Sequence, residues 1–166
     1  MDREKILETV YRKAFEYEAE RGSCPQCVLA ALMETLDFGD KKIVKYADAL
    51  AGGTALSAEG TCGALVGGLM AISYFVGRPY EDFSNGKSIR RVFLYSKKLY
   101  DKFVEEYGTP ICKGVHQKLF GRTFDLLDND DYAEFDRMGG HVDKCTSVSG
   151  NVARWTAEII LDSLKK

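Results

Sequence analysis

The sequence predicts an all-α fold, a single compact domain of about six to eight helices. Apolar residues recur at three- and four-residue steps through much of the chain, which is the spacing of one helix face. No segment alternates apolar and polar residues as a half-buried strand does, and no hairpin turn lies between strand-like segments. With 166 residues, 45% of them hydrophobic, the chain can bury one core, so we expect one domain over residues 1–166.

Three segments carry the helical spacing most clearly. The first, between Ile6 and Phe15, has charged residues between its apolar positions and predicts an amphipathic helix. A second, between Ile89 and Tyr107, repeats the pattern and predicts a long middle helix. A third, between Val148 and Ile159, predicts a helix near the C-terminus.

Residues 60–77 contain no charged side chain and are near the lower length limit for a membrane span. Gly63 and Gly67 form a Gly-x-x-x-Gly pair, which allows close helix packing and is also a membrane packing motif. The segment is short, contains five glycines and lies among amphipathic helices that need a core to cover. We therefore expect a central buried helix and no membrane span.

The charge of the chain excludes some classes of partner. A net charge of −2 gives no indication of binding to nucleic acid or to an anionic membrane surface. The segment MDREKILETV is charged from residue 2 and lacks the apolar region of a secretory signal. We therefore expect a cytoplasmic, reducing compartment, where grouped cysteines bind metals or take part in catalysis more often than they form structural disulfides.

Five cysteines fit no single local motif, and their odd number argues against a closed set of disulfides: Cys24, Cys27, Cys62, Cys112 and Cys145. Four of the cysteine-bearing segments have the features of helix starts. The partial positive charge and free N–H groups at a helix N-terminus lower the pKa of a thiol and favour the thiolate, which binds metals and attacks disulfides. Several such cysteines predict one convergent sulfur site. The alternative is five buried, small apolar side chains.

The local sequence supports these helix starts. Serine, threonine and aspartate are favoured N-cap residues, a glutamine three residues later closes a capping box, and proline is favoured in the first turn. The N-caps that these rules predict are Ser23, with Gln26 closing the box, Thr109, ahead of Pro110, and Asp143. Cys24, Cys112 and Cys145 then fall in first turns, and Cys62 opens the uncharged segment.

The remaining local signals are weaker. Cys24-x-x-Cys27 is typical of half a zinc site or of a redox pair. Valine follows Cys27 where a c-type haem attachment site has histidine, so we expect no c-type haem. Each of the two histidines, His116 and His141, lies four residues from a cysteine and is a candidate metal ligand or proton carrier. A structural histidine is the alternative for both.

The cysteines together resemble a bacterial and archaeal family of redox proteins that is named for its cysteine pattern, C_GCAxxG_C_C. The resemblance covers roughly residues 22–162, and Cys-Gly-Ala-x-x-Gly is its most specific element. It is carried by Cys24 in SCPQCVLAAL, Cys62 in CGALVG, Cys112 in GTPICKGV and Cys145 in HVDKCTSVSG. The resemblance implies redox activity at these four cysteines. A related domain in split-Soret cytochromes implies an iron–sulfur site, and Cys27 is additional to the four-cysteine pattern.

Three functions follow as hypotheses. The first is electron transfer through an iron–sulfur centre bound by Cys24, Cys62, Cys112 and Cys145, with Cys27 and His116 as further candidate metal ligands. The second is a metal-free thiol–disulfide redox protein or sensor. The third is a structural or carrier protein with a cysteine-rich zinc or copper site. The redox partner is not identified by the sequence, and a homodimer is left open.

Convergence of the four thiols has a chemical consequence. Thiolates at one place repel one another, and burial raises the pKa of each. Helix termini offset this by only about 0.3–2 kcal/mol each. We therefore expect the site to contain a metal centre or to lose charge by forming a disulfide.

Overall fold

The computed structural model describes residues 2–165 and confirms an all-α fold in one compact helical domain. In this part of the chain the α-helices are α1 (Arg3–Arg21), α2 (Cys24–Leu36), α3 (Lys42–Tyr46), α4 (Gly63–Val76), α5 (Tyr80–Ser84), α6 (Arg91–Tyr107), α7 (Cys112–Phe120), α8 (Asn129–Arg137) and α9 (Cys145–Ser163). A 3₁₀ turn (Asp48–Leu50) follows α3, and a π-helical turn (Gly140–Lys144) precedes α9. The two five-residue helices, α3 and α5, are too short to show periodicity in the sequence.

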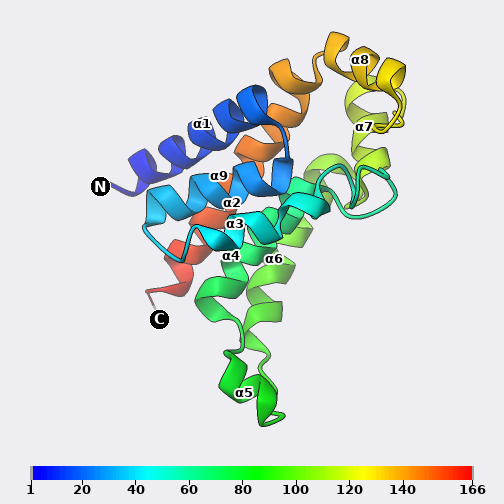
Figure 1. Cartoon of the computed structure of the whole chain (residues 1–166). Helices are drawn as coiled ribbons and strands as arrows, with labels where there is room; N and C mark the ends of the chain where they lie inside the picture. The colour runs from blue at the N-terminus through cyan, green and yellow to red at the C-terminus, as the bar shows by residue number, and fades with distance from the viewer. Residues whose placement is uncertain (1, 166) are drawn as a thin grey trace.

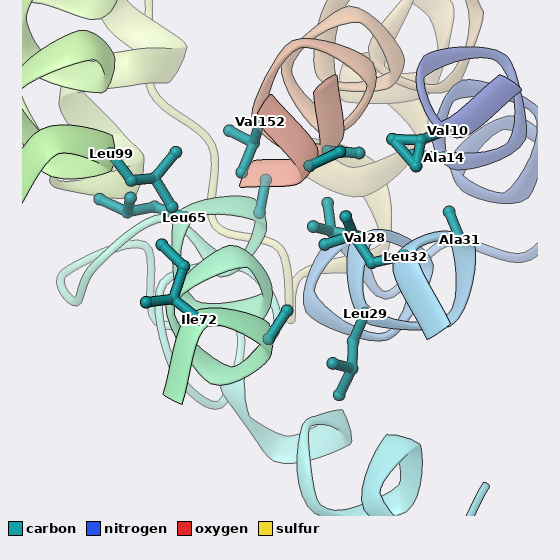
Figure 2. Close-up of a cluster of buried hydrophobic side chains, with 14 of the residues drawn as sticks. Val10, Ala14, Val28, Leu29, Ala31, Leu32, Leu65, Ile72, Leu99 and Val152 are labelled. Atoms are coloured by element: carbon teal, nitrogen blue, oxygen red, sulfur yellow. The ribbon is translucent and has the colours of Figure 1, made fainter. Parts of the chain in front are cut away.

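Five helices build the main core, because each turns one apolar side toward the others. Helix α1 packs along α9 and α2, and α4 lies among α2, α6 and α9. Figure 2 shows buried side chains of this core, from α1 (Val10, Ala14), α2 (Val28, Leu29, Ala31, Leu32), α4 (Leu65, Ile72), α6 (Leu99) and α9 (Val152). The three amphipathic segments predicted from the sequence all contribute to this core.

Helix α4 confirms the prediction of a central buried helix in the uncharged segment. Gly63 and Gly67 face α2, and Gly68 faces α6 and α9, so α4 packs closely on two sides. Within α4, only Ser73 and Tyr74 are exposed, and the other residues are buried or half-buried. None of the helices in residues 2–165 is long and apolar enough to cross a membrane.

Replacement of Gly67 by leucine should destabilise the fold. A Cβ atom at Gly67 would lie 2.5 Å from the carbonyl oxygen of Pro25, and backbone cannot move aside as a side chain can. Overpacking of this kind costs about 1–3 kcal/mol or more, and we expect the melting temperature to fall by at least about 2–4 °C. Thermal unfolding checks this, with Ser73→Ala on the exposed side of α4 as the control. An unchanged melting temperature would contradict the close approach of α2 and α4.

A smaller cluster lies at one end of the bundle. Figure 1 shows α7, α8 and the loop before α4 grouped there, while α5 projects from the molecule elsewhere. The cluster contains Phe124, Leu126 and Phe135, with Leu56, Phe120, Met138 and Cys145 packed against them. Four of the five cysteines lie at or beside this end, where the starts of four helices meet.

Candidate functional site

A cavity of about 320 Å³ is lined by Cys24, Cys62, Cys112 and Cys145. Each of these cysteines begins a helix: Cys24, Cys112 and Cys145 are the first residues of α2, α7 and α9, and Cys62 is the N-cap of α4. All five cysteines are free thiols. The structure thus brings together four cysteines that are far apart in the chain.

Cys27 does not line the cavity. It lies one turn after Cys24 in α2, is buried, and donates its thiol hydrogen to the carbonyl oxygen of Gly22 at 2.8 Å. Burial and the nearby Glu18 carboxylate raise the pKa of this thiol well above its usual value. The fifth cysteine therefore has a place of its own beside the cavity.

The capping box predicted for α2 is wrong, although Ser23 is the N-cap. Ser23 has a φ of +62°, and its hydroxyl donates to the carboxylate of Asp48 at 3.3 Å instead of accepting from the helix. The Gln26 amide donates to the carbonyl oxygen of Val44 at 3.0 Å. Both side chains tie the start of α2 to the segment around α3, a tertiary role that local spacing does not reveal.

Unlike Ser23, the other two predicted N-caps, Thr109 and Asp143, are not N-caps. Helix α7 begins at Cys112 with Ile111 as its N-cap, and the Thr109 hydroxyl accepts a hydrogen bond from the Ile111 backbone instead. Asp143 lies within the π-helical turn, and the N-cap of α9 is Lys144. The predicted helix positions were nevertheless close enough to leave Cys112 and Cys145 in the first turns.

A short backbone pairing between the segments before α4 and α7 holds Cys62 and Cys112 near each other. Because Ile111 takes part in it, α7 begins only at Cys112. Thr61 and Ile111 form an isolated antiparallel bridge. Next to it, the Cys62 N–H donates to the carbonyl oxygen of Pro110 at 2.8 Å, and the Cys112 N–H donates to that of Gly60 at 3.0 Å. The backbone thus fixes the starts of α4 and α7 relative to each other.

Two glycines bring backbone close to the cavity cysteines. A Cβ atom at Gly63 would lie 2.6 Å from the sulfur of Cys24, and a Cβ atom at Gly53 would lie 2.6 Å from the Cβ atom of Cys112. Side chains at these positions would push the cysteines away. The glycine of the Cys-Gly-Ala element therefore has a physical reason, because it allows the start of α2 to pack against the start of α4.

The wall of the cavity includes a left-handed turn. Every residue from Gly52 to Leu56 has a positive φ, and Gly52 and Leu56 line the cavity. This conformation costs roughly 1–2 kcal/mol for each non-glycine residue. The turn is held by backbone hydrogen bonds from Ala55 to Ala49 and from Ala58 to Gly52, both 2.8 Å. Strain of this kind gathers at functional sites. From the sequence, the Gly52–Gly53 pair indicates only a break between helices, and the turn itself is not predicted.

Burial determines the ionisation of the thiols: it outweighs the lowering of the pKa that helix starts alone predict, as expected for thiols that converge. Burial raises the pKa of Cys24, Cys112 and Cys145 well above the usual value for a thiol. It raises the pKa of Cys62 to about 11, although the N–H groups of Ala64 and Leu65 bond to this thiol and oppose the shift. Desolvation outweighs the helix termini. The thiols are therefore neutral at physiological pH unless a positive group binds among them.

His116 lies against two of the cavity thiols. Its Nε2 atom is 3.7 Å from the sulfur of Cys112 and 4.0 Å from the sulfur of Cys145. The side chain is 2% exposed and lies among the rings of three phenylalanines, Phe120, Phe124 and Phe135. Burial lowers the pKa of His116 to about 4, so the ring is neutral. Its Nδ1 atom has no hydrogen-bond partner among the described residues.

Glu18 is a site residue that sequence reasoning missed. It lines the same cavity, is 3% exposed, and accepts a hydrogen bond from Ser149 at 3.4 Å. Burial raises its pKa to about 7, against the opposing charge of His141. A signal was available, because Glu18 follows Ala14 by four residues on the apolar side of α1, where charged residues are rare.

The pKa of Glu18 predicts how stability changes with pH. Since folding raises this pKa from 4.5 to about 7, the stability it contributes is complete below pH 4.5 and is lost as the pH rises through 7. The loss amounts to about 3 kcal/mol. Between pH 5 and pH 8 His116, whose pKa folding lowers to about 4, changes stability in the opposite direction, so the effect of Glu18 is read as a difference between variants. In urea unfolding of the reduced protein, the stability of Glu18→Gln relative to the wild type should rise by about this amount from pH 5 to pH 8, whereas the exposed control Glu20→Gln should keep pace with the wild type. A constant difference between Glu18→Gln and the wild type would contradict the raised pKa of Glu18.

The thiols surround the cavity without meeting at one point. Among residues 2–165, no three histidine, cysteine or acidic side chains are close enough together to hold a single metal ion as they stand. The neighbouring cavity wall is largely apolar, with Leu56, Val115, Leu126, Phe135 and Val148 among its residues. The arrangement is that of four sulfur donors around a cavity with a largely apolar wall.

The family of the chain follows from a comparison over most of its length. Residues 23–159 match a family model described as "Putative redox-active protein (C_GCAxxG_C_C)". The chain belongs to this family. The resemblance inferred from the four cysteines is thereby confirmed, and membership supports a redox role in general. No curated protein and no solved structure matches the chain.

Proposed function

We propose that this protein transfers electrons through an iron–sulfur cluster held in the cavity by Cys24, Cys62, Cys112 and Cys145. The observation that carries the proposal is the convergence of these four cysteines, from four separate helix starts, on one cavity that excludes Cys27. Four cysteine thiolates are the usual ligands of such clusters.

The cavity suits such a cofactor in its donor chemistry. Its four cysteines line a space of about 320 Å³, which has room for a group with several metal ions. Burial leaves the thiols protonated, and bound iron would supply the positive charge that allows them to ionise. When bound, such a cluster accepts and donates single electrons.

The residues of this chain would shape the site in two ways. The N–H groups of Ala64 and Leu65 bond to the Cys62 sulfur and favour its charged form. The apolar wall, with Leu126 and Phe135, limits the access of water and so affects both the potential and the lifetime of a bound group. The electron donor would be a separate redox partner.

A metal-free thiol–disulfide function is the second candidate, and one observation favours it. The sulfurs of Cys112 and Cys145 lie within 4.0 Å of the same atom, Nε2 of His116. A neutral imidazole can accept a proton from one of them, and the resulting thiolate could pair with the other as a disulfide when an external disulfide accepts two electrons. The raised pKa of both thiols, and the pKa of about 4 that makes His116 a weak base, both argue that this reaction is slow.

Anaerobic purification separates the two candidates. The first predicts broad visible absorption together with bound iron and acid-labile sulfide. A colourless protein that lacks iron, and that forms a Cys112–Cys145 disulfide on mild oxidation, would overturn the iron–sulfur proposal in favour of the second candidate. Peptide mapping by mass spectrometry identifies the disulfide.

A further inference from the structure

Residues 78–98 form one end of the molecule, which we call the tip. They comprise α5, the loop after it and the start of α6, and α5 projects there from the rest of the bundle (Figure 1). Large apolar side chains that gather on a surface mark a place where a partner binds. Four such side chains of the tip are 57% to 75% exposed: Tyr80, Phe83, Phe93 and Leu94.

Helix α5 turns its two aromatic rings outward. In residues 2–165 it packs closely against no other helix. Tyr80 and Phe83 are three positions apart and so share one side of α5, with ring centroids 6.3 Å apart, whereas its two acidic side chains lie toward the other side. Arg78 closes the tip: it donates to the carbonyl oxygen of Lys87 at 2.7 Å, and its guanidinium lies 5.0 Å from the centre of the Phe83 ring. The tip is therefore held largely by its own contacts.

Cationic side chains accompany the exposed apolar ones. On α6, Arg90, Phe93 and Lys97 follow one another at three- and four-residue steps, so a ring lies between two cations on one exposed side. The two acidic residues of the tip, Glu81 and Asp82, are outnumbered by six cationic ones: Arg78, Lys87, Arg90, Arg91, Lys97 and Lys98. The tip thus has a net charge of +4, a local excess that the net charge of −2 for the whole chain conceals.

We propose that the tip binds the surface of an anionic lipid bilayer. Its cations meet the negatively charged headgroups, and its exposed apolar side chains enter the boundary between the headgroups and the acyl chains. Aromatic and leucine side chains next to lysine and arginine are the combination that holds a segment at this boundary. A second copy of the chain does not fit as the partner, because two tips of charge +4 repel each other.

The shape and position of the tip agree with such a surface. A protein partner has to match the outline of a projecting helix, whereas a bilayer adapts to it. The tip also lies away from α7 and α8 (Figure 1), so binding leaves the cavity end of the molecule facing the solution. Binding of this kind does not depend on the proposed cluster, because no residue of the tip lines the cavity.

The test is flotation of the whole protein with lipid vesicles, some of phosphatidylcholine alone and some of phosphatidylcholine mixed with phosphatidylserine. The wild type should float with the anionic vesicles at low salt and detach as salt is added, because salt screens exposed charges. It should bind the uncharged vesicles far more weakly. Equal binding to both kinds of vesicle would show that the cations of the tip play no part, and would overturn the proposal.

Two double variants of the tip separate its charges from its rings. Arg90→Gln with Lys97→Gln should weaken binding to the anionic vesicles about 20- to 30-fold, since each basic residue near such a surface contributes about fivefold. Tyr80→Ser with Phe83→Ser should weaken it at least about tenfold, because less apolar area leaves the water. All four side chains are exposed, so both variants should keep the fold, which thermal unfolding checks.

The segment around α3 provides matched controls with the same residue types. Lys41→Gln with Lys42→Gln removes two exposed cations there, and Tyr46→Ser removes an exposed ring. Both controls should bind like the wild type. If the α3 variants lost as much binding as the tip variants, or if the tip variants lost none, the tip would not be the binding surface.

A different partner would give a different result. If the wild type did not bind the anionic vesicles even at low salt, the bilayer would be excluded, and an acidic protein or a nucleic acid would take its place as the candidate. The test for iron and sulfide is separate from this one, because the tip variants leave every cavity residue in place.

Discussion

Replacement of Cys62 by serine is expected to abolish iron and sulfide binding, whereas replacement of Cys27 by serine should leave both in place. Cys62 lines the cavity and Cys27 does not. Loss of an outer-shell partner already weakens metal binding about 10- to 100-fold, so loss of a ligand should weaken it by at least about 100-fold. The fold should survive, since Cys62 is the N-cap of α4 and serine is a favoured N-cap residue.

The measurement is the iron and sulfide content of both variants after identical anaerobic purification. The comparison is matched, because each variant exchanges one buried sulfur for oxygen. A serine at position 27 can still donate to the carbonyl oxygen of Gly22, as the thiol does. If Cys27→Ser lost as much iron as Cys62→Ser, Cys27 would be a ligand, and the assignment of Cys24 as the ligand from α2 would be contradicted.

Replacement of Gly63 by alanine is expected to disable the site without changing any cysteine. The added Cβ atom would lie 2.6 Å from the Cys24 sulfur and 2.8 Å from the ring of Pro25, so the thiol must rotate away or α2 must retreat. Either movement removes one of the four sulfurs from its place around the cavity. We expect iron content to fall to nearly that of Cys62→Ser, with a loss of stability of about 1–3 kcal/mol.

Gly68→Ala provides the matched control for this prediction. Its added Cβ atom would meet Thr156 at 2.6 Å and Leu99 at 2.8 Å, so its cost in stability should be similar, but its contacts are with α9 and α6. Gly68→Ala should therefore retain iron while melting at a lower temperature. Equal iron content in the two variants, measured beside thermal unfolding, would contradict the role of Gly63 in placing Cys24.

Much of the fold could be predicted from the sequence because it depends on local pattern. The absence of charge in residues 60–77 and the Gly-x-x-x-Gly pair indicated α4 as the central helix, and apolar spacing located α1, α6 and α9. The predicted side-chain caps were wrong because these side chains have other partners. Ser23 and Gln26 bond to the segment around α3, and Thr109 bonds to Ile111, which pairs with Thr61. Pairing between distant segments leaves no periodic signal in either of them.

The candidate site was only partly predictable. The four cysteines were found through their pattern, and their approach to one cavity was expected from their positions at helix starts. Helix starts taken alone predicted a lowered pKa for the thiols, whereas convergence predicted that burial raises it, and the raised pKa is what the structure has. Glu18 was missed, although it is a charged residue on the apolar side of α1. The left-handed turn from Gly52 to Leu56 was not predicted, because its non-glycine residues do not favour a positive φ.

The central claim is that four of the five thiols belong to one redox centre. It is tested most directly by counting free thiols in denaturant, before and after exposure of the metal-free protein to air, beside the iron content of the anaerobic protein. We predict iron in the anaerobic sample and, after air exposure, fewer than five free thiols, with the missing ones mapped by mass spectrometry to the cavity cysteines. Five free thiols in both samples and no bound metal would contradict the claim and leave five ordinary buried cysteines.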